Sequence, residues 1–272
     1  MRALVVHSTK PVVGPTKARC PSSKTKLHCL TQLIPLATHS LISKDELARK
    51  FDHTNLQQDA TQADVTLLCK EAVGCDFFAV CLNPCYVVLA RDLLSGTSVK
   101  VCTVIGFPLG ANRTSTKLAE TVQALRDGAD EIDIVMNVGL FKSRKSAEVE
   151  TELRQIVSAV KSVGVNKICK VIVETGLLNA TEVELACGIV NQSGADFIKT
   201  STGFSKAGGA TIEALQIINR HRGKLKVKAA GGIRNLNTAL AMLRAGADRL
   251  GASQSVSIIE ELEQAHAGQS NR

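Results

Sequence analysis

Residues 128–174 read GADEIDIVMNVGLFKSRKSAEVETELRQIVSAVKSVGVNKICKVIVE and contain a strand, a helix and a second strand. The short apolar runs at 131–137 and 167–174 are typical of buried strands. Between them, residues 146–163 repeat apolar side chains at helical spacing. Two strands joined by a helix pair in parallel, so this stretch predicts one βαβ unit.

The same alternation continues through the chain from Asp45 onwards. Successive strand starts fall about 22 to 36 residues apart, which is typical of repeated βαβ units. Eight parallel strands in 45–272 predict an α/β fold of one domain, a closed (β/α)8 (TIM) barrel. An open doubly wound sheet is the alternative, but that fold needs a G-x-G-x-x-G after an early strand, which the sequence lacks. The remaining predicted strands are 50–55, 77–82, 99–105, 197–200, 225–230 and 248–253.

A repeated glycine marks the ends of the predicted helices. GCD at 74–76 and GAD at 128–130, 194–196 and 246–248 each follow a helical pattern and precede a strand. Glycine ends helices because it adopts the left-handed conformation without a Cβ penalty. Four copies at equivalent points predict repeated units of one architecture.

The first 44 residues differ from the rest of the chain. They contain seven of the 33 basic residues, none of the 25 acidic ones and four of the six prolines. The net charge of +8 therefore comes almost entirely from this segment. We predict a basic N-terminal extension, 1–44, that is flexible or a targeting segment, before a barrel domain at 45–272. A nearly neutral domain with 3% aromatic residues does not fit a nucleic-acid-binding surface.

The nine cysteines are scattered and form no C-x-x-C motif. Cys81 and Cys85 come nearest to one, but no second pair and no nearby His accompany them, so we expect no metal site. Free cysteines favour a reducing compartment, and we predict a cytoplasmic protein, with an organelle reached through 1–44 as the alternative. Since no apolar stretch approaches the roughly 18 residues of a membrane span, we expect no membrane partner.

Charged residues interrupt four of the predicted strands, at Asp133, Lys170, Lys199 and Lys228. Strands buried on both faces are normally continuous apolar runs, and lysine is almost never fully buried unless it is paired. The catalytic groups of a barrel come from the C-terminal ends of several strands. We therefore interpret Lys199, Lys228 and Asp133 as functional, whereas for Lys170 a structural ion pair is an equal alternative.

Lys199 and Lys228 lie on neighbouring strands, which has a chemical consequence. Two ammonium groups ~6 Å apart repel by roughly 2.8 kcal/mol at an effective dielectric of ~20, but by only about a quarter of that in water. Burial and pairing together would leave one amine uncharged near neutral pH. A neutral lysine amine in the mouth of a barrel is a nucleophile for carbonyl groups.

Two glycine-bearing turns predict a phosphate site. KAAGGIRN (228–235) leaves the seventh strand through Gly231 and Gly232 and enters a helix near Asn235, and RLGASQS (249–255) leaves the eighth. Barrels commonly bind phosphate at these two loops, through backbone N–H groups and a helix N-terminus. The expected substrate is a small phosphorylated carbonyl compound.

From about Phe51 to Ile259 the sequence resembles deoxyribose-phosphate aldolases, the DeoC family of class I aldolases. A lysine strand FIKTSTGF followed at the right distance by K-x-x-GGIR is the most specific part of this resemblance. The motifs that carry it are FDHT (51–54), FAVCLNP (78–84), GFPLGA (106–111), DEIDIVMN (130–137), VIVETG (171–176), FIKTSTGF (197–204), KAAGGIR (228–234) and LGAS (250–253).

The resemblance implies reversible cleavage of 2-deoxy-D-ribose 5-phosphate to D-glyceraldehyde 3-phosphate and acetaldehyde, in deoxyribose phosphate catabolism, without a metal or another cofactor. It implies that Lys199 forms the Schiff base, that Lys228 disfavours the charged form of Lys199, and that Asp133 moves protons through a bound water, supported by Asp52. The expected partners are these small molecules, and the assembly is expected to be a homodimer or a homotetramer. The residues expected to surround the substrate and its phosphate are Cys81, Thr202, Gly203, Gly231, Gly232, Arg234, Gly251 and Ser253.

The sequence departs from the family pattern in three places. Gln57 and Gln58 stand where Lys-Pro is common, KAAGG replaces KPAGG or KASGG, and the tail EQAHAGQSNR lacks the tyrosine of some members. Proton transfer is therefore expected to rely more on water and Asp133. Three alternatives remain open: another lysine-dependent barrel aldolase, a non-catalytic sugar-phosphate sensor, and a nucleic-acid contact made by the basic extension.

Overall fold

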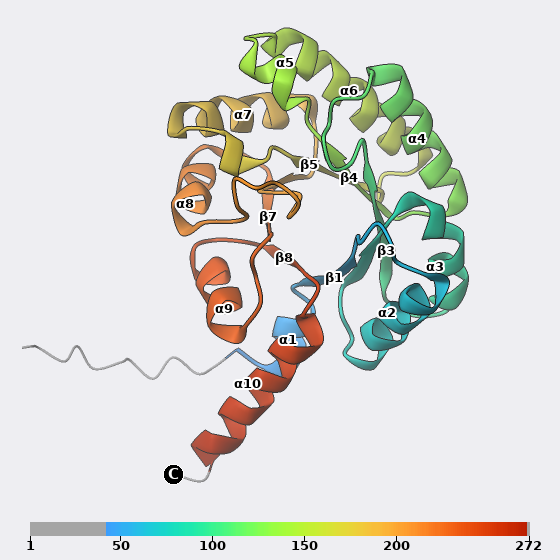
Figure 1. Ribbon diagram of the computed structural model, residues 1–272, viewed down its shortest axis with the longest axis vertical. Helices are drawn as coiled ribbons and strands as arrows, with labels where there is room; N and C mark the ends of the chain where they lie inside the picture. Colours follow the sequence, from blue (N-terminus) through green and yellow to red (C-terminus); the bar gives the residue numbers. More distant parts are fainter. Residues whose placement is uncertain (1–41, 271–272) are drawn as a thin grey trace, which may run out of the picture. The chain divides into compact units, whose positions relative to one another are not determined.

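The computed structural model describes residues 42–270, so residues 1–41, and with them most of the predicted extension, lie outside the described part. Eight parallel strands close into a barrel in the order β1 to β8, which confirms the predicted TIM barrel (Figure 1). The strands are β1 (Phe51–Asn55), β2 (Ala79–Leu82), β3 (Lys100–Ile105), β4 (Glu131–Val135), β5 (Ile168–Ile172), β6 (Phe197–Lys199), β7 (Lys226–Ala230) and β8 (Arg249–Ala252).

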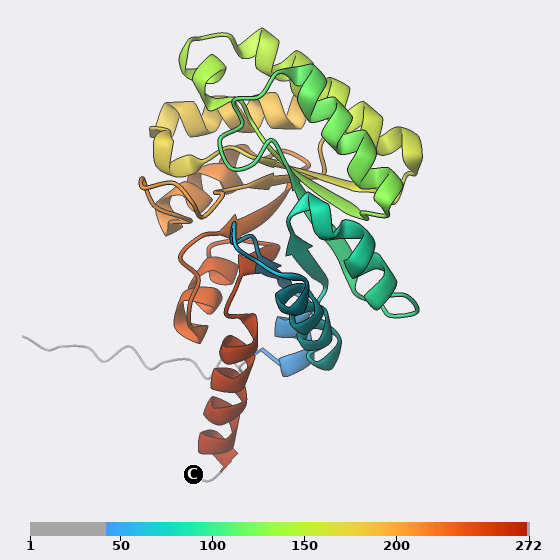
Figure 2. The same cartoon turned by 45° about the vertical axis from the view of Figure 1, so that its right-hand side comes forward.

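Helices surround the barrel and connect its strands (Figure 2). Helix α6 covers Ser146–Val163, as its apolar spacing predicts. No helix among residues 42–270 is long and apolar enough to cross a bilayer. The helices are α1 (Lys44–Ala48), α2 (Gln62–Gly74), α3 (Val87–Leu93), α4 (Thr114–Asp127), α5 (Val138–Lys142), α6, α7 (Ala180–Ser193), α8 (Ile212–His221), α9 (Leu236–Arg244) and α10 (Ser255–Ser270), with short 3-10 turns η1 (Pro84–Tyr86) and η2 (Thr175–Leu177).

Three of the four predicted glycine stops have the expected geometry. Gly128, Gly194 and Gly246 have φ values of 110°, 82° and 95°. The prediction is wrong at the first copy, because Gly74 is the last residue of α2 and Asp76 adopts the left-handed conformation instead, with φ 51°. Aspartate tolerates this conformation better than most residues because its short polar side chain bonds locally.

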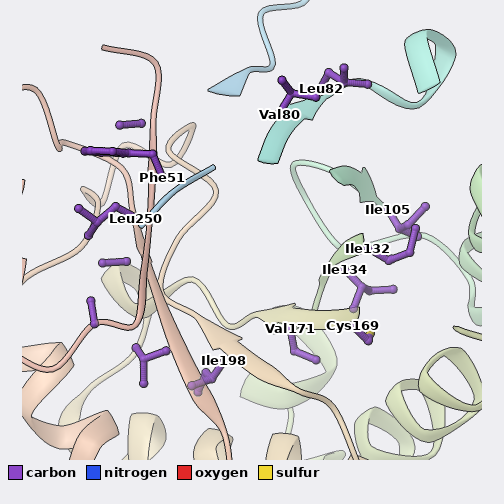
Figure 3. Packing of buried hydrophobic residues seen from close by; sticks show 14 of the residues in the cluster. Phe51, Val80, Leu82, Ile105, Ile132, Ile134, Cys169, Val171, Ile198 and Leu250 are labelled. Atoms are coloured by element: carbon purple, nitrogen blue, oxygen red, sulfur yellow. The ribbon is translucent and has the colours of Figure 1, made fainter. Parts of the chain in front are cut away.

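Side chains along each strand alternate between two environments, as the two-residue period of a strand requires. One set packs between the barrel and its helices and includes Val80, Ile132, Val171 and Leu250 (Figure 3). The other set faces the barrel interior, where ion pairs join strands that are not neighbours, such as β4 with β6 and β7. The strand charges that stand out in the sequence all belong to this second set: Asp133, Lys170, Lys199 and Lys228.

A second buried ion pair lies outside the barrel interior, between α4 and α6. Lys117 Nζ lies 2.6 Å from Glu152 Oε1 and donates to the backbone oxygen of Val135 at 2.9 Å. Both side chains are almost completely buried. The pair therefore ties two helices to the end of β4 without contacting the interior charges.

Replacing Asn179 with alanine is expected to destabilise the protein by about 1 kcal/mol and to lower Tm by about 2–4 °C. Asn179 is the N-cap of α7: its side chain accepts from the backbone N–H of Glu182, and the Glu182 side chain bonds back to the Asn179 backbone. The substitution removes the side-chain acceptor of the Glu182 N–H. Thermal unfolding checks the shift, and a Tm equal to that of the wild type would contradict it.

Candidate active site

Seven charged side chains from six strands meet inside the barrel and form the interior charge cluster. All seven residues are buried, and Lys170 and Lys228 are among the largest fully buried side chains. Consecutive strands β5 to β8 supply the cations, whereas β1 and β4 supply the carboxylates. The members are Lys170, Lys199, Lys228, Arg249, Asp52, Glu131 and Asp133.

Asp133 is the centre of this cluster. Its Oδ2 accepts hydrogen bonds from Lys199 Nζ and Lys228 Nζ, both at 2.8 Å. Its Oδ1 accepts from Lys170 Nζ at 2.7 Å and from the thiol of Cys102 at 3.2 Å. One carboxylate therefore binds three ammonium groups at once.

The other two carboxylates hold the outer members of the cluster. Arg249 donates to Asp52 Oδ1 at 2.7 Å and forms two bonds of 3.1 Å to Glu131. Lys170 also lies 2.7 Å from Glu131, and Lys228 contacts Asp52 Oδ2. The Arg249 guanidinium stacks 3.3 Å from the centre of the Phe78 ring. This arrangement neutralises nearly every buried charge in the interior.

The charges inside the barrel set the ionisation of the cluster. Burial favours neutral Asp133, but Lys170, Lys199 and Lys228 together hold the pKa of Asp133 well below its usual range. Burial also opposes the charged form of Lys228, yet Asp133 and Asp52 raise the pKa of Lys228 above its ordinary value. Asp133 is consequently an anion and Lys228 a cation at neutral pH.

The sequence-based estimate of repulsion between Lys199 and Lys228 omitted the carboxylate between them. Both amines bond to the same oxygen of Asp133, so they are not a bare like-charge pair. With every member ionised, the interior charge cluster has four cations against three anions. The loss of one proton from a lysine would make the whole cluster neutral.

A cavity of about 430 Å³ opens above this cluster, at the ends of β6, β7 and β8. Among the cluster lysines, only Lys199 lines it, with a side chain that is 3% exposed. Lys228, Asp133 and Asp52 lie deeper and do not line the cavity. The cavity is also lined by seven of the eight residues expected to surround the substrate and its phosphate, all except Cys81: Thr202, Gly203, Gly231, Gly232, Arg234, Gly251 and Ser253.

The glycines of these loops allow a close approach of three backbone segments. Gly231 has φ 86°, and a Cβ added to it would lie 2.9 Å from the Cα of Gly209 and 3.3 Å from that of Gly203. The following helix α9 begins after Asn235, whose side chain caps it by accepting from the Thr238 N–H. The structure thus confirms the predicted helix start near Asn235 and leaves backbone N–H groups near the cavity.

The strands β2 and β3 contribute an apolar wall to the interior. Cys81 and Cys102 are register partners on these strands and pack with Leu56, Ala79 and Val104. A hydrogen bond from Cys102 lowers the pKa of Cys81 to about 7, whereas burial raises that of Cys102. Cys81 was expected to surround the substrate, but it lies in the interior and does not line the cavity.

Four residues of this interior were not selected as functional from the sequence: Glu131, Lys170, Arg249 and Cys102. Lys170 was noticed as a strand charge but was not selected. The two-residue period of a strand could have identified Glu131 and Arg249, since Glu131 shares a face with Asp133 and Arg249 shares one with Gly251. Cys102 is the register partner of Cys81, which a single sequence does not reveal.

Two buried groups of side chains have the spacing of metal ligands. They are Cys81, Cys102 and Asp133, and Asp52, Cys102 and Glu131, with ligand atoms within 4.8 Å of one another. Lys170 Nζ already bonds to Cys102 Sγ, Asp133 and Glu131. The cation that these ligands hold is an ammonium group, so they do not fit a metal ion.

Comparison with known proteins places this geometry in a family. Residues 47–258 match the model of the DeoC/LacD family aldolases. The chain is 49% identical to the deoxyribose-phosphate aldolase of Aciduliprofundum boonei, over 80% of this chain and 97% of that protein. It is 47% identical to deoxyribose-phosphate aldolase 1 of Bacillus licheniformis, over 80% and 96%.

A solved structure matches the same region. The deoxyribose phosphate aldolase from Aeropyrum pernix, described as having a unique tetrameric structure, superposes with a TM-score of 0.76 at 34% identity. The match covers 81% of this chain and 92% of that one. With the family model spanning nearly the whole barrel, the chain belongs to the DeoC/LacD family of aldolases.

Proposed function

We propose that this protein is a deoxyribose-phosphate aldolase, which cleaves 2-deoxy-D-ribose 5-phosphate reversibly to D-glyceraldehyde 3-phosphate and acetaldehyde. One observation carries the proposal: Lys199 lines the cavity while its amine shares an oxygen of Asp133 with a second buried lysine. Relatives at 47–49% identity with the same name support the choice of substrate. The reaction is that of a carbon–carbon lyase of class I.

Lys199 is the nucleophile in this proposal. It contacts one carboxylate, whereas Lys228 contacts two and Lys170 three. The interior charge cluster has one positive charge in excess. Loss of a proton from Lys199 therefore breaks fewer ion pairs than loss of a proton from Lys170 or Lys228. The resulting amine attacks C1 of the open-chain sugar phosphate and forms a carbinolamine.

Loss of water from the carbinolamine gives a protonated imine on Lys199. Deprotonation of the C3 hydroxyl then breaks the C2–C3 bond, and the electron pair moves into the imine to give an enamine. Glyceraldehyde 3-phosphate leaves at this point. Protonation of the enamine at C2 and hydrolysis of the imine release acetaldehyde and restore Lys199.

Asp133 and Lys228 supply the proton transfers. A carboxyl group whose pKa lies well below its usual range stays ionised at neutral pH, so Asp133 acts as an acceptor and orients the Lys199 nitrogen. Lys228, bonded to the same oxygen at 2.8 Å, is the proton donor. Asp52 holds Lys228 in this position, and Cys81 belongs to the apolar wall near the acetaldehyde carbons.

The decisive test is a coupled assay for glyceraldehyde 3-phosphate release from deoxyribose 5-phosphate, with and without a chelator. Turnover that is insensitive to the chelator is expected. A different lysine-dependent aldolase would turn over another phosphorylated or keto-acid substrate instead. A sugar-phosphate sensor would be protected against unfolding by the ligand but would not turn it over. A nucleic-acid contact made by the extension would disappear on deletion of residues 1–40.

Gly231→Ala is expected to raise KM for deoxyribose 5-phosphate by on the order of tenfold, because one lost charge-assisted hydrogen bond is worth about that much. The added Cβ pushes Gly231 away from Gly209 and displaces N–H groups near the phosphate. Steady-state kinetics with phosphorylated and unphosphorylated deoxyribose measure the effect, which should be small for the latter. Gly188→Ala, with no neighbouring atom within 4 Å, is the control; an unchanged KM in Gly231→Ala would refute the phosphate assignment.

We also propose an assembly state and a location for this protein. A homodimer or homotetramer is supported by the tetrameric relative from Aeropyrum pernix. A cytoplasmic location is supported by the free cysteines among residues 42–270, which suit a reducing compartment. An organelle address in 1–44 falls mainly outside the described residues. Size-exclusion chromatography and localisation of the tagged full-length chain test both.

A further inference from the structure

Glu174 lies directly after β5 in an unusual backbone conformation. Its φ is 56°, in the left-handed region that residues with a Cβ rarely adopt, and the residue is 4% exposed. The predicted strand 167–174 ends before it, at Ile172. A buried, charged residue in this conformation persists only when its surroundings fix it, and such positions cluster at functional sites.

The side chain of Glu174 binds a single residue of the next loop. Its two oxygens each accept from the backbone N–H of Thr202 at 3.3 Å, and Oε2 accepts from the Thr202 hydroxyl at 2.5 Å. A threonine has one hydroxyl proton and one backbone N–H. Both donors of Thr202 are therefore committed to Glu174.

The backbone around Glu174 is held against the strand of Lys199. The N–H groups of Val173 and Thr175 donate to the backbone oxygens of Lys199 and Thr200, at 3.1 and 2.8 Å. The Thr202 Oγ accepts from the Phe204 N–H at 3.1 Å and keeps further acceptor capacity. Thr202 itself lines the cavity. Its hydroxyl thus has a fixed orientation relative to the Lys199 strand.

We infer that Glu174 is a positioning residue that makes Thr202 a pure hydrogen-bond acceptor, so that Thr202 selects a substrate hydroxyl and does not bind phosphate. Phosphate oxygens need donors, and Thr202 has none to offer. A hydroxyl on the carbon chain between the imine and the phosphate has the required proton. The inference rests on the proposed aldolase function and revises the expectation that Thr202 contacts the phosphate.

The test uses aldol addition of acetaldehyde to glyceraldehyde 3-phosphate and to its 2-fluoro analogue. Fluorine replaces the hydroxyl at similar size but has no proton to donate. In Glu174→Gln the side-chain amide NH2 group donates to the hydroxyl oxygen of Thr202. The hydroxyl proton of Thr202 can then bond to another acceptor. The preference of the wild type for the hydroxyl compound is expected to fall about fivefold to tenfold, the effect of one neutral hydrogen bond. The fall should appear mainly in KM, and comparison between variants cancels the intrinsic reactivity of the fluoro compound.

Two further variants separate positioning from a structural role. Thr202→Val should lose the same preference, and Glu174→Gln combined with Thr202→Val should lose no more than either alone, because Glu174 acts through Thr202. Glu174→Gly keeps the left-handed backbone without the carboxylate and should also lose the preference, even if Glu174→Gln folds poorly. Glu182→Gln, which changes a half-buried capping glutamate on α7, is the matched control.

The outcomes are distinct. Additive losses in the double variant, or an equal fall in kcat with both aldehydes, would overturn the role of Glu174. Borohydride trapping of acetaldehyde on Lys199 should remain intact in each variant, which shows that the aldolase assignment stands while this inference is judged. Absence of trapping and turnover in the wild type would remove the proposed function, and the inference with it.

Discussion

Lys199→Ala is expected to reduce aldolase turnover by on the order of 10⁴–10⁶-fold, as loss of an essential nucleophile does in other covalent enzymes. In the wild type, borohydride with acetaldehyde should attach one ethyl group to Lys199. Lys199 is the cluster lysine that lines the cavity, whereas Lys170 and Lys228 are completely buried below it. The variant should therefore lose the label and not transfer it to a neighbouring lysine.

Peptide mass spectrometry after trapping locates the label. Lys224→Ala is the matched control, because Lys224 is exposed and precedes the opposite end of β7. This control should retain both turnover and labelling. Labelling of Lys228 in the wild type, or full turnover in Lys199→Ala, would end the proposed mechanism.

Asp133→Asn is expected to lower kcat by about 10²–10⁴-fold and to destabilise the protein by about 3–5 kcal/mol. The amide keeps the shape of the side chain but removes the charge that three ammonium groups share. Denaturant unfolding and steady-state kinetics measure the two effects separately. Adding Lys228→Met should restore part of the stability, because it removes an unpaired charge, but none of the activity.

Glu152→Gln provides the control for Asp133→Asn. It removes the charge from a buried partner of Lys117 in the same way, but neither residue lines the cavity. It should destabilise the protein while kcat stays near that of the wild type under folding conditions. If Asp133→Asn lost stability alone, with kcat retained, Asp133 would be a structural residue and the proton-transfer scheme would fail.

The barrel and its catalytic face follow from local sequence, because strand runs and glycine stops are short-range signals. The charges in β4, β6 and β7 stand out for the same reason, since each interrupts an apolar run. The roles of Glu131 and Arg249 were not evident because their ion-pair partners lie far away in the sequence. Arg249 reaches Asp52 across 197 positions of the sequence, and no local pattern encodes that pairing.

The electrostatics of the site were only partly predictable for a related reason. Two lysines on adjacent strands suggested repulsion, but Asp133 bonds to both of them and Asp52 also pairs with Lys228. The predicted strand 167–174 includes Glu174, whereas Glu174 adopts a left-handed backbone and bonds to Thr202, 28 positions further on. In both cases a long-range contact determines what the local residue does.

The alternation of strand side chains between two environments has a consequence for how this protein tolerates change. Val171 belongs to the apolar shell, and its neighbours in sequence, Lys170 and Ile172, point the other way. Substitutions in the shell, such as Ile to Val at position 132 or 198, are expected to lower the free energy of unfolding by about 0.5–1.5 kcal/mol. They should not change the shape of the cavity. Directed evolution can thus vary thermal stability and substrate preference separately, by changing alternate positions along each strand.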